Sequence, residues 1–116
     1  MQRKVVKLLR DMMDAGEAIQ SYARGLTQQE FLADRQRRHA TEREFEIIGE
    51  ALRRLTIETP GLASRISHVD QIIGFRNILA HGYDSIREAD LWVTVTRDVP
   101  ILLREMQVIL EEHLRP

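Results

Sequence analysis

Apolar residues recur at three- and four-residue intervals along nearly the whole chain, which is the spacing of amphipathic helices. The first such segment predicts a helix from about residue 2 to about residue 23, and Gly25 is placed to stop it. Its apolar positions are Val5, Leu8, Leu9, Met12, Ile19 and Tyr22. No segment shows the alternation of a strand, and the sequence has no repeat or low-complexity tract. We therefore predict an all-α fold, an up-and-down helical bundle.

A second helix is predicted to begin at Thr27, because Glu30 follows it at the spacing of a capping box. This helix is expected to continue unbroken to the turn signals at Thr59, Pro60 and Gly61. Its apolar positions are Phe31, Leu32, Phe45, Ile48, Leu52 and Leu55.

Three more helical segments are predicted in the second half. Ser67, with Asp70 or Gln71, is placed to cap the first, and Ser85 with Glu88 is placed to cap the next. The apolar positions of these two helices are Val69, Ile72, Ile73, Leu79 and Ala80, followed by Leu91, Trp92 and Val95.

The last segment begins around Asp98 and Pro100, where proline either restarts a helix or kinks a continuous one. Its apolar side is formed by Ile101, Leu102, Met106, Ile109 and Leu110. The chain of 116 residues is expected to form one domain, residues 1–116, small enough that dimerisation would help to bury apolar surface.

Arg76, Asn77, His81 and Tyr83 gather at the predicted end of one helix, where Gly82 is placed as its C-terminal cap. An imidazole has an ordinary pKa of about 6.5, so His81 suits general acid or base chemistry near neutral pH. The forked guanidinium of Arg76 suits contacts with phosphate. Alternatively, a histidine in the last turn of a helix interacts favourably with the helix dipole and has no catalytic role.

The spacing within this group has a geometric consequence. Asn77 and His81 are four residues apart and share a helix face, whereas Arg76 and His81 diverge by about 140° on an ideal helix. The two side chains meet if Arg76 bends around the helix, or if two copies of the helix face each other across a two-fold axis. We favour the second arrangement, a homodimer with one shared cleft.

The long second segment offers four supporting candidates. Asp34 and Arg38 are four residues apart and Arg43 and Glu50 are seven apart, so each pair lies along one helix face. Glu50 is expected to be at least half-buried, and a buried carboxylate needs a partner. Arg76 could be that partner, and Glu50 would then either form a structural ion pair with Arg76 or orient Arg76 for catalysis. Arg38 and Arg43 are candidates for a phosphate-binding cleft. The other arginines of this region are better explained by a solvated face with glutamate partners.

Composition and charge narrow the function classes. The formal net charge is −1, which disfavours a protein that coats nucleic acid by bulk electrostatics, and no helix reads as the basic recognition helix of a DNA-binding module. The chain has no cysteine, and its four histidines lack metal-ligand spacing, so we expect no metal and no cofactor. There is no signal-peptide pattern and no apolar run long enough to cross a membrane, so a cytoplasmic location without membrane contact is expected.

The arrangement Arg76, Asn77, His81 and Tyr83 resembles the R-x4-H-x-Y signature of the HepT-like toxins of the HEPN superfamily. The similarity covers nearly the whole chain, but Ser64, Arg65, Ile66, Ser67 and His68 replace an Ile-Pro-Trp-like stretch that is common in the family. Further matches are the block Glu46, Ile47, Ile48, Gly49, Glu50 and Ala51, together with Phe31, Asp34, Trp92, Asp98 and Pro100.

This resemblance implies a metal-independent endoribonuclease toxin of a type VII-like toxin–antitoxin module. Arg76 and His81 would be catalytic, with Asn77 supporting them, and Tyr83 would receive AMP from a minimal nucleotidyltransferase antitoxin. RNA would be the substrate, and the active form a homodimer. The alternatives are a non-catalytic HEPN subunit that binds and positions a nucleotidyltransferase, and a purely structural dimerising bundle.

Overall fold

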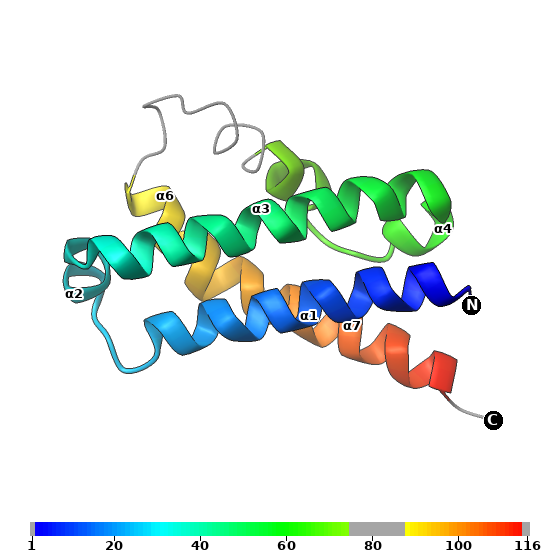
Figure 1. Cartoon of the computed structure of the whole chain (residues 1–116), viewed down its shortest axis with the longest axis horizontal. Coiled ribbons are helices and arrows are strands. Elements are labelled where there is room, and N and C mark those ends of the chain that lie inside the picture. Colours follow the sequence, from blue (N-terminus) through cyan, green and yellow to red (C-terminus); the bar gives the residue numbers. More distant parts are fainter. Residues whose placement is uncertain (1, 75–87, 115–116) are drawn as a thin grey trace.

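The structure is a computed structural model that describes residues 2–74 and 88–114 (Figure 1). All regular structure in these two ranges is helical, which confirms the predicted all-α bundle. The elements are α1 Arg3–Ala23, α2 Gln28–Ala33, α3 Arg35–Glu58, α4 Pro60–Ala63, α6 Glu88–Val93, the π-helical turn η1 Thr94–Asp98, and α7 Val99–Leu114. Residues 69–74 are also helical, and we call them the pre-motif segment because Arg76 follows them in the sequence.

Helix α1 forms the centre of the bundle, because it packs against both α3 and α7 (Figure 1). Its residues Val5, Leu9, Met12 and Ile19 are almost completely buried. The start of α1 and the end of α7 lie at the same end of the bundle (Figure 1). Aromatic and aliphatic side chains from the other helices complete the core, among them Phe31, Phe45, Ile48, Leu52, Leu55, Leu91, Leu102 and Met106.

The predicted first helix and the start of the second are confirmed. Helix α1 ends at Ala23, and Gly25 has φ +77°, a left-handed conformation that glycine adopts without a side-chain clash. The capping box is present: the Glu30 amide donates to the Thr27 hydroxyl at 3.1 Å, and the Thr27 amide donates to the Glu30 carboxylate at 2.9 Å. Both features depend on residues close in sequence, so local chemistry predicts them well.

The prediction of one unbroken second helix is wrong. The chain leaves helical geometry at Asp34, whose φ is −93° and ψ is 99°, and α3 begins at the next residue. The Asp34 carboxylate accepts the Arg37 amide at 3.1 Å and so caps the new helix. The break turns α2 so that the buried Phe31 ring lies 5.4 Å from the Trp92 ring. Hydrophobic spacing alone does not reveal such a break, because the apolar positions resume in α3.

The prediction that Ser67 caps the next helix is also wrong. Both its amide and its hydroxyl donate to the Glu105 carboxylate on α7, so the hydroxyl does not serve the helix. Helical geometry starts at Val69, after His68, which has φ 62°. The predicted cap at Ser85 and the predicted helix end at Gly82 lie outside the described residues.

Helices α6 and α7 are joined without a loop, which decides between the two predicted roles of Asp98 and Pro100. The turn η1 links them, and the Val99 amide donates to the Thr94 carbonyl five residues earlier. Proline has no backbone N–H group to donate, so a change in the register of the backbone hydrogen bonds just before Pro100 agrees with its chemistry. The helical run is continuous, with Asp98 at the end of its π-helical turn.

Candidate functional site

The four residues of the predicted motif, Arg76, Asn77, His81 and Tyr83, lie outside the described residues. Their catalytic and modification roles therefore stay predictions. The described residues next to them in the sequence are the pre-motif segment and the chain from Glu88 onward, and the other predicted site residues lie on α3 or at its start.

Asp34 and Arg38, predicted to share a helix face, lie at the break between α2 and α3. The Asp34 carboxylate is bound to Arg37, with 3.0 Å between its Oδ2 atom and the Arg37 Nε atom. Arg37 also donates to the Tyr22 carbonyl at 2.9 Å, which ties the start of α3 to the end of α1. The Arg38 side chain is partly buried, and its amide donates to the Asp34 carbonyl at 3.0 Å. Asp34 thus has a clear structural function as a cap and an ion-pair partner.

Arg43 and Glu50, whose seven-residue spacing predicts a shared helix face, both line one cleft. The cleft has a volume of about 320 Å³ between α1 and α3. Arg43 pairs with Glu46 at 3.2 Å, and Glu50 accepts from Arg53 at 2.8 Å and from Arg54 at 3.1 Å. The lining residues of the cleft are Leu8, Asp11, Arg43, Glu46, Ile47, Glu50, Ala51 and Arg54, so Arg43 belongs to it and Arg38 does not.

Glu50 therefore has two arginine partners on its own helix. These contacts compensate a carboxylate that is only 28% exposed. Hydrogen bonding to Glu50 raises the pKa of Arg53, with the attraction of the same carboxylate adding to the shift. The predicted pairing of Glu50 with Arg76 lies outside the described residues.

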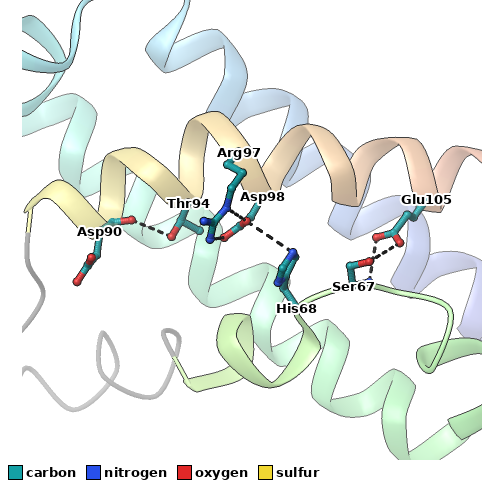
Figure 2. Close-up of polar contacts among 7 residues, drawn as sticks. All are labelled: Ser67, His68, Asp90, Thr94, Arg97, Asp98 and Glu105. Carbon is teal, nitrogen blue, oxygen red and sulfur yellow. Dashed lines mark hydrogen bonds and ion pairs between the residues drawn. The ribbon is translucent and has the colours of Figure 1, made fainter.

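A second cleft lies beside the pre-motif segment and has a volume of about 310 Å³. Its lining includes Asp98, which Figure 2 shows in contact with Arg97 and His68. The Asp98 side chain is 5% exposed. Arg97 donates to this carboxylate from Nε at 2.8 Å, and the His68 Nε2 atom lies 3.9 Å from it. The lining residues are Gln71, Ile72, Asp90, Val93, Thr94, Arg97 and Asp98.

The charge of Asp98 is balanced mainly by Arg97. Hydrogen bonding to Asp98 raises the pKa of Arg97, and the attraction of the same carboxylate adds to the shift. A distance of 3.9 Å is too long for a hydrogen bond, so His68 contributes through charge when its ring is protonated. The sequence analysis treated Asp98 only as a place where a helix restarts or kinks and as a family match, and it missed Arg97 and His68 as the partners of this carboxylate.

The stretch in which the sequence departs from the family pattern is held by side chains of the last helix. Ser67 donates to Glu105 from its amide at 2.9 Å and from its hydroxyl at 2.8 Å (Figure 2). Arg65 donates to both oxygens of Glu112, at 2.8 and 2.9 Å. Ile66, between them, is 5% exposed and anchors the stretch in the core.

Residues 2–74 and 88–114 contain no group of three or more His, Asp or Glu side chains arranged to hold a metal ion. None of the helices in these ranges is both long enough and apolar enough to span a bilayer.

Comparison with known proteins gives a consistent set of matches. The family model described as Ribonuclease HepT-like matches residues 12–109. A probable ribonuclease HepT of Thermococcus cleftensis is 31% identical, over 88% of this chain and 92% of its own length. A Methanocaldococcus jannaschii protein provisionally named an RNase is 29% identical, over 92% of this chain and 97% of its own. No solved structure was found to match the chain.

Proposed function

Because the chain belongs to the HepT-like ribonuclease family, we propose that it is a metal-independent endoribonuclease in which Arg76 and His81 are catalytic. The observation that carries this proposal is the family match over residues 12–109, a range that includes Arg76, Asn77, His81 and Tyr83 in their signature spacing. RNA is the substrate that the family implies.

The proposed reaction is attack of a ribose 2′-hydroxyl on the adjacent phosphorus. The 2′-oxygen forms a bond to phosphorus, the bond to the 5′-oxygen breaks, and a 2′,3′-cyclic phosphate remains. One His81 accepts the proton of the 2′-hydroxyl, and a protonated His81 from a second chain donates a proton to the leaving 5′-oxygen. Arg76 stabilises the negative charge that develops on the phosphorane, and Asn77 holds the imidazole or a phosphate oxygen.

A two-fold dimer is part of this proposal. Arg76 and His81 diverge by about 140° on one ideal helix, so a composite cleft needs residues from both chains. Mixing wild type with inactive His81→Ala protein tests it: after subunit exchange each mixed dimer has only one His81 in the shared cleft, so its cleavage rate should fall well below half of the wild-type rate. Mixed dimers that keep half of the wild-type rate after verified exchange contradict a composite cleft.

The nuclease itself is tested with purified wild type, Arg76→Ala and His81→Ala on a labelled RNA in excess EDTA. Each substitution is expected to lower the rate by on the order of 10² to 10³, the typical effect of losing a group that stabilises transition-state charge. His39→Ala is the matched control, because His39 is exposed on α3 and lies outside the signature. Equal cleavage by all folded variants contradicts the catalytic assignment. Loss of wild-type activity in EDTA, restored by magnesium, contradicts metal independence.

We further propose that a nucleotidyltransferase antitoxin silences the enzyme by attaching AMP to Tyr83. The added phosphate would place negative charge and bulk beside Arg76 and His81 and repel the RNA backbone. Mass spectrometry of the protein treated with a minimal nucleotidyltransferase of the proposed antitoxin type, ATP and magnesium should show one AMP on the Tyr83 peptide, and Tyr83→Phe should escape silencing. Neutralisation without added mass means that the antitoxin acts by binding alone.

A further inference from the structure

Three carboxylates stand seven residues apart on the last helical run, at Asp98, Glu105 and Glu112. Seven residues are close to two helical turns, so the three side chains form one stripe along the helix. Every member contacts the same short connection between α4 and the pre-motif segment. The pairs are Arg65 with Glu112, Ser67 with Glu105, and His68 with Asp98. We call Asp98, Glu105 and Glu112 the carboxylate stripe.

The central pair of the stripe is the most specific. Ser67 uses both its amide and its hydroxyl, at 2.9 and 2.8 Å, and each donates to a different oxygen of Glu105. This contact fixes the backbone at Ser67 as well as its side chain. The pair of Arg65 with Glu112, in contrast, joins two side chains only. Figure 2 shows Ser67 turned toward Glu105 and His68 turned toward Asp98.

The held connection ends where the pre-motif segment begins. His68 has φ 62°, a left-handed conformation that is unfavourable for residues with a side chain, so neighbouring contacts must keep it in place. Its carbonyl accepts the Ile72 amide at 3.0 Å, the bond that closes the first turn of the segment. The position of that turn is thus set by the residues that the stripe holds.

We infer that the carboxylate stripe, with Glu105 at its centre, is a set of positioning residues for the proposed nuclease, because it fixes the segment that precedes Arg76 in the chain. The inference rests on the proposed function for its effect on cleavage. Its structural part, that the stripe holds residues 69–74, can be measured without any activity.

The test compares Glu105→Ala with Glu111→Ala in the full-length protein. Glu111 is the matched control because it lies on the same helix, is exposed, and accepts a bond from Gln107 of α7 itself at 2.9 Å. Ser67 is exposed, so water can replace the hydrogen bonds that it loses, and Glu105→Ala is therefore expected to stay folded. Amide exchange of the peptide covering residues 69–74 should accelerate by at least about fivefold in Glu105→Ala, the effect expected for one of the two hydrogen bonds that are lost, and stay unchanged in Glu111→Ala.

Cleavage kinetics supply the second measurement. A small displacement of catalytic groups lowers kcat by about 10- to 100-fold. Glu105→Ala should therefore have a lower kcat and a nearly unchanged KM. Glu105→Gln should restore both measurements, because its amide oxygen can accept the Ser67 amide and its amide nitrogen can donate to the hydroxyl.

Exchange of residues 69–74 that is equal in Glu105→Ala and Glu111→Ala overturns the inference. So does faster exchange with unchanged kcat in an active enzyme. A wild type that does not cleave RNA refutes the nuclease proposal instead, and the exchange comparison still decides whether the stripe holds the segment.

Discussion

Gly16 on α1 sets how closely the last helix approaches the centre of the bundle. It is buried, and a Cβ atom added there would lie 2.9 Å from Leu103 Cδ2 and 3.2 Å from Leu103 Cγ on α7. Both distances are shorter than ordinary carbon contacts, so Leu103 must move when residue 16 gains a methyl group. The helix that carries the carboxylate stripe therefore depends on this glycine for its position.

Two opposing effects decide the result of Gly16→Ala. Alanine is favoured over glycine inside a helix by about 1 kcal/mol. Overpacking a close contact costs about 1 to 3 kcal/mol, and the overlap reaches Leu103 Cγ as well as the end of the side chain. We expect the contact to dominate, so that Gly16→Ala lowers the free energy of unfolding by about 1 kcal/mol. In a Leu103→Ala background the same change should raise it by about 1 kcal/mol, because only the propensity gain remains.

Urea unfolding followed by far-UV circular dichroism measures these differences, at one fixed protein concentration because the protein is proposed to dimerise. Gly61→Ala is the control: a Cβ atom there has no neighbour within 4 Å, so the change should stabilise by about 0.4 to 1 kcal/mol. An equal effect of Gly16→Ala in both backgrounds would show that the contact with Leu103 is not the cause of the destabilisation.

Two further predictions concern the core and the capping box. Phe45→Ala should lower the free energy of unfolding by about 3 to 5 kcal/mol in the same assay, because the ring is 1% exposed and its loss leaves a cavity; a loss near zero would mean that the site collapses or is not buried. The pKa of Glu30 is lowered, mainly by the hydrogen bond from the Thr27 amide and to a smaller extent by the Thr27 side chain. The charged Glu30 therefore stabilises the fold above its ordinary pKa of about 4.3, and this stabilisation is lost as the pH falls through the lowered pKa. Unfolding curves of wild type and Glu30→Ala should therefore differ at neutral pH and converge in acid, whereas a constant difference would mean that the charge is not the cause.

The parts of the fold that depend on neighbouring residues could be predicted from the sequence. Helix α1 and the Thr27 capping box follow from apolar spacing and from residues within one helical turn. The break at Asp34 could not be predicted with the same rules, because the apolar pattern hardly changes across it. The Asp34 carboxylate accepts the Arg37 amide, which has no carbonyl partner at the start of the new helix. An aspartate three residues before Arg37 was the available signal, but we interpreted it as one side of a helix face.

The candidate site shows the same division. The seven-residue spacing of Arg43 and Glu50 predicts that they share a face, and both line the cleft between α1 and α3. Ser67 was predicted to cap its own helix, but it binds Glu105, 38 residues away, and no local rule selects that partner. The equal spacing of Asp98, Glu105 and Glu112 could have indicated a stripe, although not the connection that it holds. The roles of Arg76, Asn77, His81 and Tyr83 stay predictions.

RNA cleavage by His81 can be tested directly by mapping RNA ends in cells after induced expression of the protein. We expect the wild type to cause growth arrest and to produce new 2′,3′-cyclic phosphate ends, and His81→Ala, expressed as a folded protein at the same level, to do neither. Identical RNA ends in cells expressing either protein would contradict it.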